Sequence, residues 1–95
     1  MSKTIEEVKA VIKNDILMNR LELGDAGIRL EDLHDETLLM DDNGLALDSV
    51  NALDIVVAIE DYFGFSIEQV DANFFDNHVS TIESLAQYIM GRLAK

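Results

Sequence analysis

Apolar side chains recur at helical spacing at both ends of the chain. Near the N-terminus they form one stripe of a helix predicted over residues 4–22 and ended by Gly24. Near the C-terminus a second stripe follows Ser80 and Glu83, which together form a capping box that predicts the start of the last helix. The stripes consist of Ile5, Val8, Val11, Ile12, Ile16 and Leu23 in the first helix and of Ile82, Leu85, Ala86, Ile89 and Leu93 in the last.

The middle of the chain contains a loop-like segment followed by a helical one. Residues 24–47 mix glycines and acidic residues with leucines, which predicts a long loop held to the core by its leucines. A helical pattern then runs from Asp48 to Gly64, a residue suited to a left-handed helix end, and a short helix is predicted over residues 71–77. We therefore expect one all-α domain, residues 1–95. Its fold should be a small four-helix bundle, three main helices and one short helix, with a long loop between the first two.

The helix that starts at Asp48 has apolar residues on two opposite faces. One face is expected to pack in the core, and the other is predicted to bind partners, because a purely solvated face has no use for exposed valines framed by carboxylates. The core face carries Ala52, Ile55, Val56, Ile59 and Phe63, and the partner face carries Val50, Asp54, Val57 and Asp61.

Charge narrows the range of partners. The chain has 19 acidic residues against 7 lysines and arginines, a net charge of −12, and it has no lysine or arginine between Arg29 and Arg92. Such a surface repels nucleic acids and anionic lipids, so we expect basic protein partners. No apolar run is long enough to span a membrane, and Glu6 and Glu7 interrupt any secretory signal. These features predict a monomeric cytoplasmic protein without membrane insertion.

Metal binding and catalysis are poorly supported by the sequence. Cysteine is absent, and aligning Gly44 with the glycine of a calcium-binding EF-hand loop puts Leu39 and Val50 where carboxylate ligands belong. Ser49 does not lie in the Gly-x-Ser-x-Gly turn of a hydrolase, and the spacing of His34 and His78 does not point to it. We therefore predict no metal site and no catalytic residue.

Ser49 stands at the start of a helix, where free amide groups and the helix dipole favour an anion. Around it the chain resembles the acyl carrier protein family, the phosphopantetheine-dependent carriers. The resemblance is strongest over residues 44–64, where Gly44 to Leu47 precede Asp48-Ser49-Val50 and the helix ends in Glu60-Asp61-Tyr62-Phe63-Gly64. The family motif is Asp-Ser-Leu, preceded by Gly-x-x and followed by an acidic helix ending in Glu-x-x-Phe-Gly.

The resemblance implies a 4′-phosphopantetheine arm esterified to Ser49, beside Asp48, with an acyl intermediate held on the arm as a thioester. A phosphopantetheinyl transferase and acyl-synthesis enzymes with basic patches would be the partners. The acyl chain is expected to fold back toward an interior pocket. Partner contacts are assigned to Val50, Asp54, Val57, Glu60 and Asp61, and the pocket to Ile55, Ile59 and Phe63.

Some features differ from the common family pattern. Val50 replaces the usual leucine, and Asn51 stands where many members carry an acid. The loop over residues 35–47 is similar to that of carriers in specialised pathways rather than in housekeeping fatty-acid synthesis. Fatty-acyl, polyketide and aminoacyl or peptidyl cargo all stay open, as does an acidic interaction protein that is never modified.

Overall fold

The computed structural model describes residues 4–68 and 70–93, so both ends of the predicted domain lie outside the described residues. The predicted all-α fold is confirmed: the described residues form helices, and an isolated bridge between Leu38 and Thr81 is their one β-type pairing. The elements in order are α1 (Ile5–Ala10), η1 (Val11–Arg20), η2 (Leu23–Ala26), η3 (Leu30–Asp32), α2 (Ser49–Phe63), α3 (Ala72–His78) and α4 (Ile82–Leu93).

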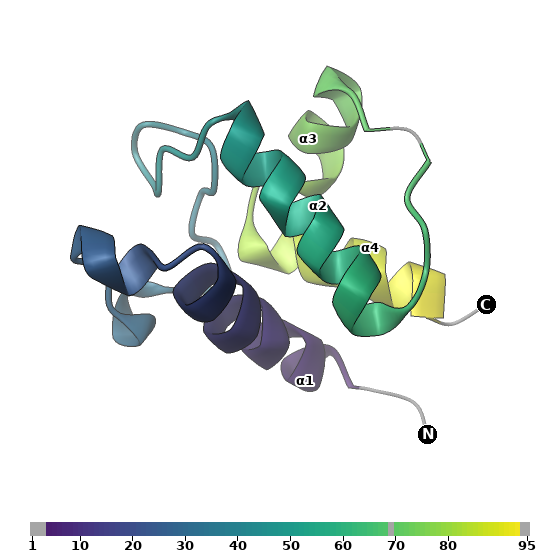
Figure 1. The fold of residues 1–95 in the computed structure, drawn as a ribbon, viewed down its shortest axis with the longest axis horizontal. Helices are drawn as coiled ribbons and strands as arrows, with labels where there is room; N and C mark the ends of the chain where they lie inside the picture. The colour runs from purple at the N-terminus through teal and green to yellow at the C-terminus, as the bar shows by residue number, and fades with distance from the viewer. Residues whose placement is uncertain (1–3, 69, 94–95) are drawn as a thin grey trace.

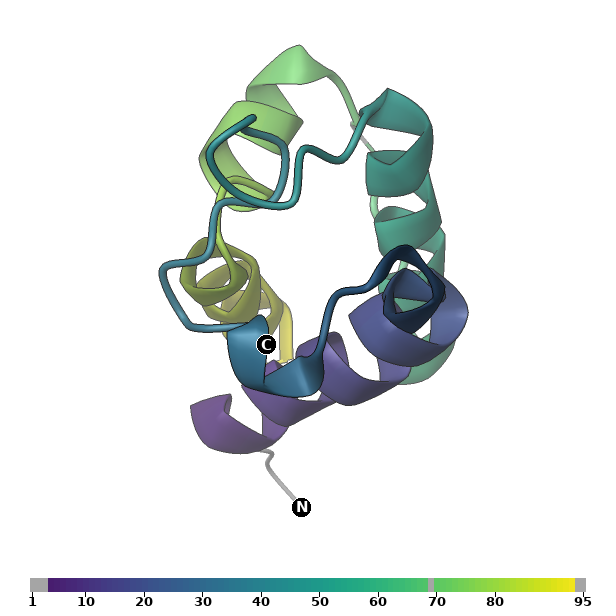
Figure 2. The ribbon, with the colours of Figure 1, turned by 90° about the vertical axis from the view of Figure 1, so that its left-hand side faces the viewer.

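The helices surround one apolar core. Helix α1 continues directly into η1, α1 packs on α4, and η1 packs on α2 (Figure 1). Seen from the side, α2 lies opposite α3 and α4, and the segment α1–η1 lies beneath them (Figure 2). No helix within residues 4–68 and 70–93 is long and apolar enough to cross a membrane. The fully buried large side chains are Val8, Ile12, Ile16, Leu17, Leu39, Ile55, Ile59, Val79, Ile82, Leu85 and Ile89.

The first helix ends earlier than predicted. It stops at Arg20 rather than at residue 22, and Glu22 rather than Gly24 takes the left-handed conformation, with φ of 55°. The turns of η1 are wider than those of an α-helix, as shown by the 2.9 Å hydrogen bond from the Leu21 amide to the Ile16 carbonyl five residues back. This reversal of the chain places Leu23 in the core, with 7% of its surface exposed.

The prediction of the cap of the last helix was wrong by one residue. Thr81, not Ser80, caps α4: its hydroxyl accepts the Ser84 amide at 3.0 Å, and the Ser84 hydroxyl accepts the Thr81 amide at 3.0 Å. The Glu83 carboxylate takes no part in this cap and binds Lys9 at 2.6 Å.

The short helix predicted over residues 71–77 is confirmed as α3. Asp71 caps it by accepting the Phe74 amide at 2.9 Å, and the Phe74 ring meets Tyr88 of α4 edge-on at 5.2 Å between ring centres. The connection between α2 and α3 is also fixed to α4. Arg92 donates to the Ser66 carbonyl at 2.8 Å.

The long loop before α2 is held in place by leucines and by backbone pairing. Of its leucines, Leu33 and Leu39 are buried, whereas Leu30 is 44% exposed. The Leu39 amide donates to the Ser80 carbonyl at 2.9 Å, and the Leu39 carbonyl accepts the Leu47 amide at 2.9 Å. Residues 35–39 therefore connect the start of α4 to the residues that lead into α2.

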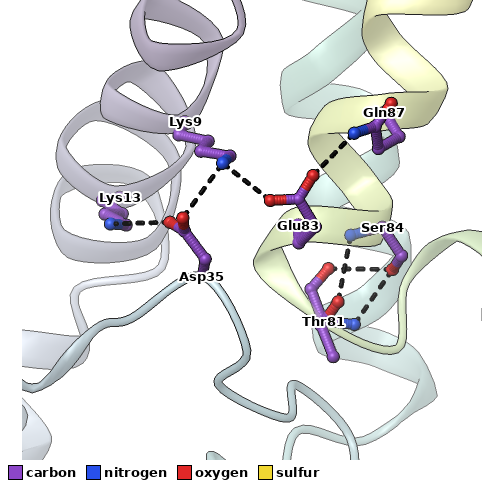
Figure 3. A network of polar contacts seen from close by, with 7 residues as sticks. All are labelled: Lys9, Lys13, Asp35, Thr81, Glu83, Ser84 and Gln87. Atoms are coloured by element: carbon purple, nitrogen blue, oxygen red, sulfur yellow. Dashed lines mark hydrogen bonds and ion pairs between the residues drawn. The ribbon is translucent and has the colours of Figure 1, made fainter.

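A cluster of charges fastens the same loop to two helices. Lys9 of α1 binds Asp35 of the loop at 3.0 Å and Glu83 of α4 at 2.6 Å (Figure 3). Lys13 approaches the other Asp35 oxygen at 3.4 Å, and Gln87 donates to Glu83 at 2.7 Å. The Lys9 side chain is only 13% exposed, so one well-shielded cation joins three segments of the chain.

The charge cluster predicts a distinct pH dependence of stability. Hydrogen bonds from Lys9 lower the pKa of Asp35 and of Glu83, and those bonds raise the pKa of Lys9 above its ordinary value. A lowered carboxyl pKa stabilises the fold above the unfolded-state pKa, and this contribution is lost as the pH falls through the folded-state pKa. A raised lysine pKa contributes below its unfolded value and is lost at strongly alkaline pH.

We therefore expect Lys9→Met to have a lower melting temperature than wild type near neutral pH. This difference in melting temperature should shrink below about pH 4. Relief of the overall negative charge by acid affects both proteins, so the difference between their melting curves isolates the cluster. Lys13→Met removes the same charge but no bond to Glu83, and it should have the smaller effect. A gap that stays constant from pH 7 to pH 3 would contradict this interpretation.

Candidate functional site

The start of α2 is fixed by a reciprocal cap. The Asp48 carboxylate accepts the Asn51 amide at 2.9 Å, and the Asn51 side chain accepts the Asp48 amide at 3.4 Å. Ser49 is the first residue of the helix and is exposed, and within the described residues its hydroxyl has no hydrogen-bond partner. Asn51 thus completes the cap that precedes and orients Ser49.

The residues before Ser49 are held in an unusual conformation. Ala46 has φ of 54°, a left-handed value that is costly for a residue with a β-carbon. On either side, the Leu45 amide donates to the Leu38 carbonyl at 2.8 Å and Leu47 is buried. Gly44 is needed here because a β-carbon at this position would collide with the Leu38 backbone. The loop thus determines where Ser49 lies relative to the core.

The outward face of α2 forms an apolar stripe, defined here as Val50, Leu53 and Val57. These side chains are 65%, 47% and 43% exposed. Leu53 was not among the predicted partner residues, although its spacing of three from Val50 and four from Val57 could have revealed it. Asp54 is also exposed, beside the stripe.

The two other predicted partner residues, Glu60 and Asp61, already bind groups of this chain. The Glu60 carboxylate accepts the Ile67 amide at 2.8 Å, and Asp61 pairs with Arg20 at 3.0 Å. The five predicted partner residues therefore lie on one helix, but only Val50, Asp54 and Val57 are exposed without a polar partner in the described part of the chain.

The inward face of α2 supplies the three residues predicted to line an acyl pocket. Ile55 and Ile59 are fully buried in the core, and Phe63 is partly buried at the end of the helix. A separate pocket of about 260 Å³ lies between the loop and α3. Its lining comprises Leu38, Met40, Asp41, Phe75, Asp76, Val79 and Ser80.

One comparison with known proteins identifies the family. A family model described as a phosphopantetheine attachment site matches residues 24–89, which cover the loop, α2, α3 and most of α4. The chain belongs to the phosphopantetheine-binding carrier family. A search of curated proteins gave no match. Members of this carrier family hold 4′-phosphopantetheine covalently on a serine.

Four serines of the carrier lie within the matched region, and their surroundings differ. Ser80 and Ser84 are partly buried and their hydroxyls lie 3.3 Å apart. Ser66 is exposed but lies in the connection after α2. Ser49 alone combines an exposed hydroxyl with the first position of a helix of 15 residues. An anion on that oxygen would face the positive end of the helix dipole.

In the described part of the chain, neither His34 nor His78 forms a hydrogen bond with Ser49 that would let it act as a base. The His78 ring packs against Tyr88 at 4.6 Å and Phe74 at 5.2 Å between ring centres. His34 is exposed in the loop, where its amide donates to the Thr37 hydroxyl at 2.8 Å. In the part of the chain that the structure describes, no three His, Cys, Asp or Glu residues are grouped to hold a metal ion.

Proposed function

We propose that the protein is an acyl carrier that bears its 4′-phosphopantetheine arm on Ser49 and presents thioester-linked acyl intermediates to synthesis enzymes. The observation that carries this proposal is the exposed, unbonded hydroxyl of Ser49 at the first position of α2. The arm supplies a thiol that holds the cargo. The chain supplies the attachment oxygen, the rigid helix start formed with Asp48, and the surfaces that partners recognise.

The surroundings of Ser49 suit a phosphodiester. The amides of Ser49 and Val50 belong to the first turn, where backbone N–H groups have no partner within the helix. A phosphodiester on the Ser49 oxygen would lie close to these donors and to the positive end of the helix dipole. The Asp48 carboxylate is occupied in the cap, where it stabilises the helix start rather than acting as a base.

Partner binding is proposed to run through the outward face of α2. The apolar stripe can desolvate against a complementary patch, while Asp54 attracts lysine and arginine side chains. Glu60 and Asp61 add to the negative field of the same helix, although each already has a partner within the chain. A transferase and acyl-synthesis enzymes with basic patches around their active sites fit this surface. No residue of the carrier needs to catalyse the attachment, because the transferase brings its own catalytic groups.

Incubation with a phosphopantetheinyl transferase, coenzyme A and Mg²⁺ tests the carrier assignment. Intact mass spectrometry should show the addition of one arm, and peptide mapping should place it on the peptide that contains Ser49. The protein from its native cell, weighed intact, would also reveal the mass of the cargo and so separate acyl from aminoacyl or peptidyl chains. Wild-type protein that stays unmodified with several transferases would exclude the carrier function.

The cargo is proposed to enter the core beneath α2. The side chains of Ile55 and Ile59 face inward from the helix that begins at Ser49, and their surroundings are apolar. Both are fully buried, so an acyl chain must displace core side chains to reach them.

Chemical-shift changes at Ile55 and Ile59 should therefore grow with acyl-chain length. The methyl groups of Leu53 and Val57, on the outward face of the same helix, serve as controls and should change little. Changes centred on Met40 and Phe75 would instead place the cargo in the pocket between the loop and α3. Changes confined to the neighbours of Ser49 would show that the cargo stays in solvent.

A further inference from the structure

The last turn of α2 is held by other parts of the chain. Arg20, at the end of η1, binds Asp61 with 3.0 Å between Nη1 and Oδ2. Glu60 accepts the Ile67 amide. Two consecutive residues of α2, Glu60 and Asp61, thus direct their carboxylates to partners within the molecule.

The first half of the outward face is free of such contacts. Among residues 4–68 and 70–93, Asp54 forms no hydrogen bond or ion pair, and it lies beside the apolar stripe of Val50, Leu53 and Val57. The Arg20 pair is the one ion pair of the described residues that reaches α2. The two halves of this face therefore differ in available negative charge, although each carries an aspartate, Asp54 in the first and Asp61 in the second.

We propose that Arg20 competes with the basic residues of partner enzymes for Asp61, and so restricts docking to the apolar stripe and Asp54. This inference rests on the proposed function. The matching partner patch is apolar, with a lysine or arginine placed to meet Asp54. A partner that also needs Asp61 must displace Arg20, which makes Arg20 a specificity-determining residue for docking.

The exposure of the pair makes such competition possible. The Arg20 side chain is 40% exposed and that of Asp61 is 64% exposed, so water and salt screen their attraction. A pair of this kind opens at small cost, yet while it is closed it neutralises one carboxylate on the docking side. Arg20 therefore modulates recognition without being needed for the fold.

Arg20→Gln tests this proposal through the rate of arm transfer, measured with a phosphopantetheinyl transferase that modifies the wild type. We expect kcat/KM to rise about two- to fivefold at low salt. The gain should disappear near 1 M NaCl, where the Debye length is about 3 Å. The melting temperature of each variant verifies that the fold is intact.

Arg29→Gln is the matched control. It removes the same charge from another exposed ion pair, Arg29 with Glu31 at 3.1 Å, which lies in the loop rather than on α2. Its kcat/KM should stay close to that of wild type. Equal gains for the two variants would overturn the proposal, because overall charge alone would then explain them.

Asp61→Asn separates occupation of Asp61 from a long-range effect of Arg20. If Arg20 occupies this carboxylate, Asp61→Asn should lower kcat/KM more in the Arg20→Gln protein than in wild type. Equal losses in the two backgrounds would overturn the proposal, as would a lower kcat/KM for Arg20→Gln itself. Failure of every variant, wild type included, to accept the arm would overturn the proposed function and this inference with it.

Discussion

Alanine at position 49 is expected to abolish attachment of the phosphopantetheine arm, the largest functional effect of any single substitution in this chain. The phosphodiester needs an oxygen at the exposed first position of α2, and alanine provides none. Helix α2 should persist, because its cap is formed by Asp48 and Asn51 and not by Ser49. Intact mass after incubation with transferase and coenzyme A should therefore remain that of the unmodified protein.

Ser66→Ala provides the matched control. Ser66 is the other exposed serine of the matched region, and only its backbone carbonyl takes part in a hydrogen bond, from Arg92. This variant should gain one arm at the wild-type rate. An arm on Ser49→Ala, or its loss from Ser66→Ala with the fold intact by circular dichroism, would assign the attachment to a different serine.

Local signals in the sequence were sufficient to predict α2 and its surroundings. The helix was predicted from Asp48 to Gly64, and the structure has Asp48 as its N-cap and Gly64, with φ of 77°, as its left-handed end. Both ends depend on side chains or backbone within three or four residues. The two faces of the helix follow from its periodicity alone, which is why Val50 and Val57 were expected to be exposed.

Contacts between distant parts of the chain account for what the sequence did not reveal. The pairing of Arg20 with Asp61 spans 41 residues, so nothing near Asp61 indicated that its charge is neutralised. Glu83 fits a capping box with Ser80 by spacing, but Thr81 and Ser84 form the cap, and the Glu83 carboxylate binds Lys9 of α1. In the same way, the first helix ends at Arg20 rather than at residue 22, and the left-handed turn at Glu22 is followed by Leu23, which is buried in the core.

The loop before α2 was predicted correctly in part and missed in part. Its mixed composition predicted irregular structure pinned by leucines, and Leu33 and Leu39 are indeed buried. The composition could not distinguish these from Leu30, which is 44% exposed, because all three lie in one stretch that mixes leucines with acidic residues. The distinction arises from the backbone pairing that draws residues 38–39 between the segments before α2 and α4.

Leu39→Ala should therefore be one of the most destabilising substitutions in the protein, although it lies in a loop. Leu39 is fully buried, and removal of its side chain leaves a cavity where the loop meets the starts of α2 and α4. Such a change costs about 2–5 kcal/mol of unfolding free energy, a large share of the roughly 5–15 kcal/mol that holds a domain folded. Urea denaturation followed by circular dichroism measures the loss.

Leu30→Ala tests whether burial rather than loop position sets this cost. It removes the same atoms from the same loop, but Leu30 is 44% exposed, so a change within about 0.5 kcal/mol is expected. Similar losses at the two positions would contradict the packing of the loop described above. A large loss at Leu39 alone would show that the loop is part of the core. Any slower arm transfer to Leu39→Ala would then reflect misplacement of Ser49, because the Leu39 carbonyl anchors the Leu47 amide just before α2.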